Sequence, residues 1–376
     1  MHASSPNSAG AVLIAAISGR SLAAAARRAG FSPLVADLFR DNDTVALSGR
    51  AALAAGDLGS GIDFGRLPDT LRDLAAGDRV EALVLGSGFE QRPDAIDALA
   101  EKFPLAGNRA AAIARVKEPQ RLAEDCAELG IPHPEFRREK PADPENWLVK
   151  TAGGAGGGHV AGANGAAVKP GRYFQRFIEG RNLSALFIAD RRAAHLVGFS
   201  RQWASPAPGA PYRYGGAVRL RRFDRREAAR IAQWLSGLTA RAGLTGLCSA
   251  DFIRNEDGCH LVEINPRPGA TLDIFDDEAA PLLKAHIEAC RGKPFRVPRF
   301  DDSMASLVTY TSRPIERFPK IAWPDWTADR QPAGTRLAAG DPVCTVFARG
   351  GSAGTTRRAA EALAAGLSRH WEGGLA

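Results

Sequence analysis

Short apolar runs alternate with helix-like segments along the first third of the chain, and this alternation constrains the fold more than any other feature. Residues 12–17 and 82–85 are continuous apolar runs, as strands buried on both faces are. An alanine-rich helix is predicted for residues 22–29. This order predicts an α/β fold with a doubly wound parallel sheet and ligands at the carboxyl ends of its strands. The turns at residues 18–20 and 86–90 are therefore candidate substrate contacts, although ordinary glycine turns explain them equally well.

The composition is that of a globular protein with a mild positive charge. The chain has 376 residues, enough for two or three domains. Apolar residues make up 45% and charged residues 24%, which excludes a disordered or fibrous chain. Lys and Arg number 49 against 42 Asp and Glu, so the net charge is +7. This excess is far from a polybasic nucleic-acid-binding tail, and it suits an anionic small molecule equally well.

Neither secretion nor a membrane span is predicted. No apolar run approaches the roughly 18 residues that a spanning helix needs. The first ten residues carry no Lys or Arg, and the apolar run after them is too short for a signal core. The cysteines are scattered, without Cys-x-x-Cys spacing, which favours reduced, mostly buried thiols in a cytoplasmic protein. They are Cys126, Cys248, Cys259, Cys290 and Cys344.

A glycine-rich run follows a predicted strand that ends in Lys150. Glycine permits positive φ angles and close backbone approach, so successive N–H groups can surround phosphate oxygens. A lysine at the edge of such a loop adds a point charge on the same phosphates. The spacing matches neither the P-loop nor the dinucleotide-binding pattern, and a flexible linker is the alternative. The glycines are Gly153, Gly154, Gly156, Gly157 and Gly158.

A predicted hairpin brings two carboxylates together. Residues 247–254 and 259–265 have strand character, and a three-residue loop at residues 256–258 would connect them. In that register Asp251 lies directly opposite Glu263, with their Cβ atoms about 4.5–5.5 Å apart. Like charges in such positions destabilise a sheet unless a counter-charge lies between them.

Asn265 extends this carboxylate pair, because residues two apart on a strand point the same way. Two carboxylates and an amide oxygen form a ligand set that suits Mg²⁺, completed by water and phosphate oxygens. A solvated strand face is the alternative, with Arg254 or Arg267 offsetting the negative charge. The sequence favours a magnesium–phosphate site.

Four segments in a fixed order carry a family resemblance. Lys117 precedes a helix that Gly-Ile-Pro closes, and Lys150 precedes the glycine run. A segment Gln-Arg-Phe-Ile-Glu-Gly follows at residues 175–180, and the hairpin leads into Asn-Pro-Arg-Pro-Gly. Together these segments resemble the ATP-grasp superfamily of carboxylate–amine ligases over residues 113–290.

The resemblance implies an ATP-grasp fold, in which two α+β lobes clamp ATP, with a Rossmann-like parallel α/β domain before it. A small β-rich appendage is expected after it. The implied units are residues 1–112 for the Rossmann-like domain, 113–185 for the small lobe, 186–300 for the large lobe and 301–376 for the appendage.

The resemblance also implies the cofactors and their ligands. ATP would bind with two Mg²⁺ ions, Mn²⁺ being an alternative, on Asp251, Glu263 and Asn265. Lys117 and Lys150 would hold the α- and β-phosphates beneath the glycine loop. Arg267 would stabilise the transferring phosphoryl group. Backbone groups of four residues would contact adenine: Gln175, Arg176, Phe177 and Ile178.

One position departs from the family pattern. Related ligases often carry a glutamate for the ribose hydroxyls shortly after the hinge, and this chain has Asn182. An asparagine can still bond one hydroxyl, so the nucleotide preference is the property most affected. Glu179 is close in sequence but is predicted to face the other way.

Candidate substrate contacts lie outside these motifs. Arg219 and Arg221 alternate with apolar residues on a predicted strand, where an arginine row would hold a substrate carboxylate. A solvated strand face is equally consistent, and RNA binding is a weaker alternative. Ser87 and Glu90, in a turn that follows a predicted strand, complete the substrate candidates.

The function that these motifs favour is ATP-dependent, ADP-forming ligation of a small-molecule carboxylic acid to an amine through an acyl phosphate. The C-terminal segment loosely resembles ATP-grasp proteins of one-carbon cofactor synthesis, which suggests glutamate ligation in methanofuran- or pterin-type pathways, as by the tyramine–glutamate ligases. The alternatives are a non-catalytic nucleotide-gated binding protein and an acyl-phosphate-forming enzyme with a different nucleophile. Family habit suggests a homodimer, and neither nucleic acid nor membrane is expected as a partner.

Overall fold

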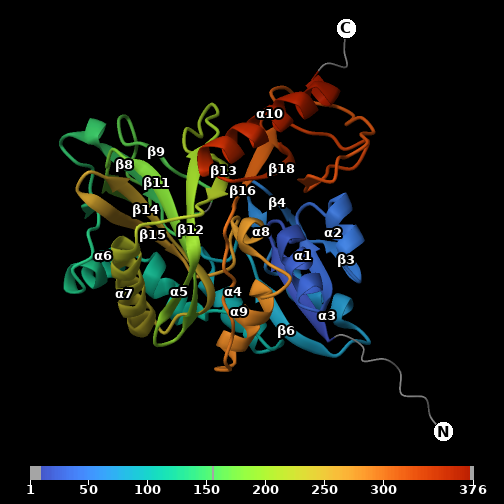
Figure 1. Ribbon diagram of the computed structural model, residues 1–376, viewed down its shortest axis with the longest axis horizontal. Coiled ribbons are helices and arrows are strands. Elements are labelled where there is room, and N and C mark those ends of the chain that lie inside the picture. The colour runs from blue at the N-terminus through green and yellow to red at the C-terminus, as the bar shows by residue number, and fades with distance from the viewer. Residues whose placement is uncertain (1–9, 155, 373–376) are drawn as a thin grey trace.

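The N-terminal part of the chain is a parallel sheet with helices on both faces (Figure 1). This computed structural model describes residues 10–154 and 156–372. The sheet order is β3-β2-β1-β6, and all three pairings are parallel. Its strands are β1 (Ala11–Ala16), β2 (Ser32–Asp37), β3 (Arg50–Leu53) and β6 (Val80–Leu85). The predicted doubly wound sheet is confirmed, whereas residues 1–9, which bear on the secretion prediction, lie outside the described residues.

Alternate residues of the central strand β1 supply two cores. Val12 and Ile14 pack towards α1, and Leu13 packs towards α3. Each face therefore needs an apolar residue at every second position, which is why the sequence reads as a continuous apolar run. The remaining elements are α1 (Arg20–Arg28), α2 (Asn42–Leu47), α3 (Leu67–Ala75), α4 (Pro93–Ala100) and the hairpin β4 (Gly56–Asp57) with β5 (Gly61–Ile62).

A second, smaller sheet follows two short helices. Its order is β7-β10-β8-β9, and it is antiparallel around the central pair β8 and β10. A compact core of Trp147, Val149, Ala163 and Phe174 lies on one face. The elements are α5 (Ala110–Lys117), α6 (Pro119–Glu128), β7 (Phe136–Arg137), the 3-10 turn Pro144–Asn146, β8 (Trp147–Thr151), β9 (Ala161–Gly162) and β10 (Arg172–Arg176).

The largest element is an eight-stranded antiparallel sheet in the order β15-β14-β11-β12-β13-β16-β18-β17. One face packs on α5, α6 and α7, and the other packs on α8, α9 and the N-terminal domain. Its strands are β11 (Arg181–Asp190), β12 (Ala194–Ala204), β13 (Tyr214–Arg219), β14 (Thr245–Asn255), β15 (Gly258–Asn265), β16 (Ser303–Tyr310), β17 (Thr327–Ala328) and β18 (Pro342–Gly350). Its helices are α7 (Arg225–Ala242), α8 (Leu272–Phe275), α9 (Leu282–Cys290) and α10 (Ala353–Glu372).

Two predicted boundaries do not coincide with the elements of the structure. The limit between residues 185 and 186 falls inside β11, so the large lobe begins with that strand. The predicted C-terminal appendage is joined to the large sheet, because β16 pairs with β13 and with β18. Strands β10 and β11 belong to different sheets. The chain between them is therefore a connection between lobes.

The hairpin of β14 and β15 pairs Asp251 with Glu263 as predicted, but its loop length and the register next to the loop differ from the prediction. Asn255 pairs with Gly258, so the loop has two residues rather than three. A register shift between Asp251 and Phe252 restores the predicted pairing. Such a β-bulge places two residues of one strand against one of its partner.

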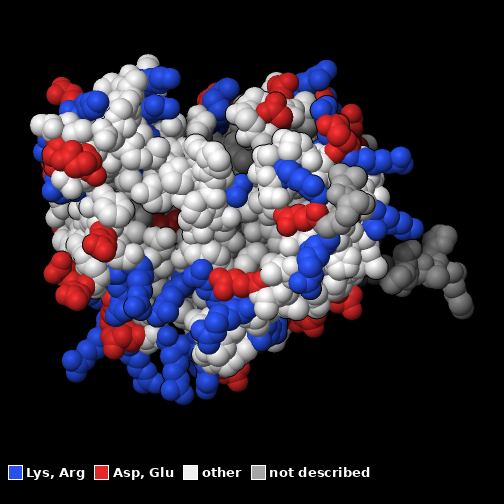
Figure 2. Space-filling view, turned by 90° about the horizontal axis from the view of Figure 1, so that it is seen from above, with Lys and Arg blue, Asp and Glu red and all other residues white. Residues whose placement is uncertain are grey.

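Charged side chains are spread unevenly over the surface. In Figure 2, Lys and Arg side chains gather along one edge of the face seen from above, at the lower left.

Within the described residues, no helix has the length and apolar character needed to cross a membrane.

A buried ion cluster ties the N-terminal domain to the rest of the molecule. Arg20, at the start of α1, donates two hydrogen bonds to Asp273 at 2.6 and 2.7 Å and two to Asp329 at 2.9 and 3.0 Å. Burial acts to raise the pKa of Asp329, but the Arg20 guanidinium more than offsets it, so that pKa lies below its usual range. The turn at residues 18–20, a candidate substrate contact, is thus a structural tie.

Replacing Arg20 should destabilise the protein in a pH-dependent way. Arg20→Ala leaves two partly buried carboxylates without their cation and should cost about 2 kcal/mol of unfolding free energy at neutral pH. The depressed pKa of Asp329 stabilises the fold above the carboxyl's unfolded pKa, and this stability is lost as pH falls through its folded value. The difference between wild type and variant should therefore be close to full at neutral pH and shrink only below the unfolded carboxyl pKa of about 3.9, for example at about pH 3.

Urea unfolding at both pH values measures this effect. Arg72→Ala is the matched control, because Arg72 forms an exposed pair with Asp69 at 2.7 Å. It should change stability by about 0.5 kcal/mol or less. Equal effects of the two substitutions would show that the Arg20 cluster is not a structural tie.

Candidate active site

The hairpin carboxylates and a lysine from α5 meet on one face of the large sheet. Lys117 Nζ donates a hydrogen bond to Glu263 Oε1 at 2.5 Å and to Asn265 Oδ1 at 2.8 Å. Lys117 is the last residue of α5 and is buried. The pairing of Asp251 with Glu263 confirms that the two carboxylates are neighbours, as predicted. Lys117 is the cation that offsets their negative charge.

The positive charge does not come from the two arginines considered in the alternative interpretation. Arg254 pairs with Glu227 of α7 on the other face of the sheet, at 2.9 Å. Arg267 pairs with Glu90 of the N-terminal domain. The carboxylate pair therefore lies within the protein's own cluster of lysines rather than on a solvated strand face.

The pKa values of Asp251 and Glu263 are shifted in opposite directions. Burial raises the pKa of Asp251, and the negative charge of Glu263 raises it further. Burial also acts to raise the pKa of Glu263, but Lys117 and then Lys150 more than offset it, so that pKa is lowered. At neutral pH Glu263 is the carboxylate that the lysines hold ionised.

Amide side chains hold the Asp251 carboxylate in place. Asn265 Nδ2 donates to Asp251 Oδ2 at 2.9 Å, and Gln202 Nε2 of β12 approaches Oδ1 at 3.4 Å. Sequence reasoning missed Gln202, which no local motif marks. The set of two carboxylates and the Asn265 amide oxygen fits a hard divalent cation such as Mg²⁺. Among the described residues no three His, Cys, Asp or Glu side chains form such a set, so phosphate oxygens and water would have to complete the shell.

Lys150 approaches the same cluster from the small lobe. Its Nζ donates to Gln175 Oε1 at 2.5 Å, across the paired strands β8 and β10. Burial lowers the pKa of Lys150, while Glu263 and Asp251 act to raise it. A buried lysine beside two carboxylates is suited to an anionic ligand placed between the lobes.

The hinge residues serve partly structural roles. The Arg176 and Phe177 amides donate to Glu135 O and Asn146 O, each at 2.8 Å, and the Gln175 side chain holds Lys150. Ile178 follows without regular structure. Asn182 is exposed on β11, on the same side of the strand as Ser184, which pairs with Asp251. The structure thus places the predicted ribose residue on the face that carries the carboxylates.

Arg267 is held between the large lobe and the N-terminal domain. Its Nε donates to Glu90 Oε1, and Glu90 Oε2 accepts from the Gly88 and Phe89 amides at 3.2 and 3.1 Å. Burial acts to raise the pKa of Glu90, but Arg267 and Lys117 offset it and the pKa is lowered. Of the predicted substrate contacts, Glu90 therefore lies at the site.

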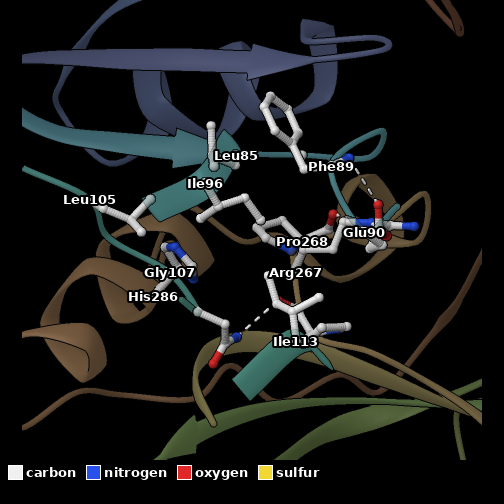
Figure 3. Close-up of a pocket in the computed structure, with 13 residues that line it drawn as sticks. Leu85, Phe89, Glu90, Ile96, Leu105, Gly107, Ile113, Arg267, Pro268 and His286 are labelled. Atoms are coloured by element: carbon white, nitrogen blue, oxygen red, sulfur yellow. Dashed lines mark hydrogen bonds and ion pairs between the residues drawn. The ribbon is translucent and has the colours of Figure 1, made fainter. Parts of the chain in front are cut away.

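A narrow, mainly apolar pocket adjoins this ion pair (Figure 3). In Figure 3, Leu85 and Ile96 of the N-terminal domain lie on the side of the pocket next to Pro268. Ile113 of α5 and His286 of α9 complete its walls. The pocket therefore lies where the N-terminal domain meets the segment that carries Arg267.

Asn108 holds that segment and His286 holds β14 beside it, and sequence reasoning missed both. Asn108 Nδ2 donates to Pro266 O at 2.9 Å, and its Oδ1 accepts from the Thr245 amide at 2.8 Å. His286 Nδ1 accepts from the Leu247 amide at 2.8 Å, and Nε2 lies 2.9 Å from Ala106 O. Burial lowers the pKa of His286 to about 4, so the ring is neutral at physiological pH. No motif marks these residues, since their partners are distant in sequence.

Glycine is required in the loop after Lys150. A Cβ at Gly157, where φ is +75°, would lie 2.0 Å from Tyr212 O. A Cβ at Gly153, where φ is +70°, would lie 2.8 Å from Glu90 O. The Tyr214 amide donates to Gly156 O at 2.9 Å. The loop therefore contacts both the N-terminal domain and the segment before β13.

The predicted arginine row does not exist. Arg219 is buried, donates to Ile274 O at 2.5 Å and pairs with Asp302. Its guanidinium also lies 3.8 Å from the Phe300 ring centre. β13 ends at Arg219, so Arg221 is an exposed residue outside the strand. Arg219 is a structural residue, and its assignment to substrate was wrong because the burial of this strand end was not foreseen.

Ser87 lies in the turn between β6 and Glu90, where its carbonyl accepts from the Ile17 amide at 2.9 Å. It is half-buried and does not line the pocket beside Arg267. The hydrogen bond of Ser87 to Ile17 joins this turn to the chain after β1.

Comparison with known families identifies the central part of the chain. Residues 119–271 match the model of the ATP-grasp domain. The chain therefore contains an ATP-grasp domain, and the predicted resemblance is confirmed at that level. No curated protein sequence matches the chain.

Solved structures share the whole architecture. The biotin carboxylase domain of 2-oxoglutarate carboxylase from Hydrogenobacter thermophilus, a dimer in complex with MgADP, ADP and bicarbonate, has a TM-score of 0.68 at 13% identity, over 90% of this chain and 85% of that one. The L-amino acid ligase from Bacillus licheniformis has a TM-score of 0.68 at 13% identity, over 95% and 98%. N5-carboxyaminoimidazole synthetase from Staphylococcus aureus has a TM-score of 0.66 at 12% identity, over 94% and 96%. At these identities the likeness shows the α/β ATP-grasp fold alone.

The contact of Gly157 with Tyr212 gives a test of the loop position. Gly157→Ala should displace the glycine loop and expose the segment at residues 205–213, because a Cβ there meets backbone. Limited proteolysis of the purified protein should then cut this segment faster. Gly158→Ala is the matched control, because a Cβ at Gly158 has nothing within 4 Å. Equal cleavage of both variants and wild type would contradict the described contact.

Proposed function

We propose that this protein is an ATP-dependent, ADP-forming ligase that joins a small carboxylic acid to an amine through an acyl phosphate. The observation that carries the proposal is the cluster of Lys117, Lys150, Asp251, Glu263 and Asn265 between the two lobes. Two lysines beside a hard-cation ligand set form a site for a metal-bound polyphosphate. The ATP-grasp domain match and the shared fold support the nucleotide as ATP.

The residues divide into phosphate-holding and charge-balancing groups. Lys117 and Lys150 would bind the α- and β-phosphates, one from each side of the cleft. Asp251, Glu263 and Asn265 would hold Mg²⁺, whose chemistry is to neutralise charge that develops on the phosphates. Because Lys117 now contacts two of these ligands, binding of metal and nucleotide would require it to turn towards the phosphates.

The chemical step follows from these positions. A substrate carboxylate oxygen bonds to the γ-phosphorus of ATP while the bond from that phosphorus to the β–γ bridging oxygen breaks, and ADP leaves. The amine then attacks the acyl carbon, loses a proton, and inorganic phosphate leaves. Arg267 would stabilise the phosphoryl group in both steps, and contact of the glycine loop with the rest of the protein would exclude water.

The Glu90–Arg267 pair favours the side of Arg267 for the acid substrate. The Glu90 carboxylate holds Arg267 Nε and leaves the rest of the guanidinium for a substrate or phosphoryl oxygen. The adjoining pocket of Leu85, Ile96 and Ile113 holds about 20 Å³, room for one water-sized group, so the bulk of the acid would lie outside it. We keep Arg221 and Ser87 outside this site.

A narrower proposal concerns the pathway and the assembly. The sequence of the C-terminal segment supports glutamate ligation in methanofuran- or pterin-type cofactor synthesis by a cytoplasmic enzyme. Family habit supports two Mg²⁺ ions, with Mn²⁺ as a substitute, and a homodimer. The segment's place in the large sheet gives it a structural role as well.

The decisive experiment measures ADP release from Mg-ATP by the purified protein with pools of carboxylic acids and amines. Release that depends on one acid and one amine would establish the ligase and name its substrates. ATP binding without release from any pool would favour a nucleotide-gated binding protein. Acid-dependent release without an amine would favour a different nucleophile.

Glu263→Gln should abolish this activity. Loss of one metal carboxylate should lower the rate of ADP release by about 100-fold or more, because charge on the phosphates is no longer neutralised. Glu256→Gln is the matched control, since Glu256 lies in the turn of the same hairpin. Normal turnover in Glu263→Gln would remove this residue from the metal site.

Arg267→Ala should separate nucleotide binding from chemistry. The turnover rate should fall by about 100-fold, as for loss of a donor to a developing charge. The dissociation constant for ATP, measured by calorimetry, should stay within about twofold, because Arg267 lies on the acid side of the cluster. A parallel loss of ATP affinity would contradict the role assigned to Arg267.

A further inference from the structure

A second pocket lies on the opposite face of the large sheet from the carboxylate cluster. Its polar lining consists of four arginines, one amide and one carboxylate: Arg181, Arg201, Arg222, Arg254, Asn182 and Asp224. We call it the arginine pocket. Side chains alternate along β11, so Ser184 faces the carboxylates and Leu183 faces α7. The arginines therefore lie on the other side of β11 from the carboxylates, and the pocket adjoins the proposed ATP site through Asn182, the predicted ribose residue, which also lines it.

Most of the positive charge of this pocket is unpaired. Arg254 donates to Glu227 at 2.9 Å, and Asp224 caps α7 by accepting from the Glu227 amide at 2.8 Å. Both nearby acids are therefore already engaged. Within residues 10–154 and 156–372, no carboxylate lies within 4.0 Å of the guanidinium nitrogens of the other three, which are Arg181, Arg201 and Arg222.

The pairing of the strands brings the like charges close together. Arg181 lies directly opposite Arg254 across β11 and β14. Arg201 lies opposite Leu183 across β11 and β12, so it is a diagonal neighbour of Arg181 on the same face. Like charges opposed across a sheet destabilise it unless a counter-charge lies between them. The four arginines are exposed, and Glu227 and Asp224 offset only part of their charge, so a bound anion would offset the rest.

The shape of the pocket restricts the ligand that supplies it. The cavity is about 180 Å³ and is also lined by Leu183, Leu220 and Phe223, the last stacked on Phe199 at 3.9 Å. This volume is below the roughly 300–1,000 Å³ of ordinary cofactor pockets. Guanidinium groups bind phosphate oxygens in a fork geometry that matches tetrahedral oxyanions.

We propose that the arginine pocket binds a small polyanion of the phosphate class, such as a diphosphate group. Arg181, Arg201 and Arg222 supply the charge, and Arg254 shares its charge with Glu227. The site lies at the start of β11, directly after the connection between the lobes. It is independent of the proposed ligase activity.

Calorimetric titration with inorganic pyrophosphate, without divalent cations, tests the proposal. The titration uses the full chain carrying Lys150→Ala, which removes a phosphate ligand of the proposed ATP site. We expect saturable binding at one site. Adding Arg201→Ala or Arg222→Ala should raise the dissociation constant about tenfold, as expected for loss of one charge-assisted hydrogen bond.

Arg221→Ala is the matched control. The substitution removes the same charge from an exposed residue that lies next to the pocket in sequence but does not line it. It should change the dissociation constant by less than about twofold. Equal losses in the Arg201, Arg222 and Arg221 variants would show general attraction to a basic surface and overturn the proposal. Absence of saturable binding in the Lys150→Ala chain would overturn it too, as would citrate binding more tightly than pyrophosphate.

Discussion

The single β-bulge in the β14–β15 hairpin is the constraint on which the site depends. Before it, Cys259 and Leu261 of β15 point into the core under α7, and after it Ile264 does so. The core positions therefore change from odd to even numbers, which a regular strand cannot do. The same change turns Glu263 towards Lys117 and pairs it with Asp251. One inserted residue thus satisfies a packed core and a charged face together.

The charges on that face are closely balanced in the absence of any ligand. Lys117 and Lys150 oppose Asp251 and Glu263, and Glu90 opposes Arg267. Buried charges are tolerated when they are paired and hydrogen-bonded. The proposed nucleotide and metal would therefore exchange partners within an existing network of charges.

Local sequence patterns predicted the elements better than the contacts between them. Residues 12–17 and 82–85 read as buried strands because both faces of that sheet are covered, and Asp251 opposite Glu263 followed from hairpin pairing. Asn108, Gln202 and His286 were missed, because their partners come from strands and loops far away in the sequence.

The assignment of Arg219 failed for a related reason. An alternating strand looks the same whether its polar side faces solvent or a partner such as Asp302. The addition of β16 and β18 to the large sheet was equally invisible, since strand order is set by tertiary packing. Charge and alternation locate polar positions, whereas the fold decides which of them are reactive.

The separation of the two sheets has a mechanical consequence. The small sheet shares no hydrogen-bonded strand with the large one, whereas the large sheet runs without interruption from the hairpin to the C-terminal strands. The large sheet packs on α5 and on the N-terminal domain, whereas the small sheet is joined to them through the chain before β7 and the chain after β10. Lys117 lies at the end of α5, beside the large sheet, and Lys150 lies on β8 of the small sheet. A polyanion bound by both lysines would link the small sheet to the rest of the protein, and its release would remove that link.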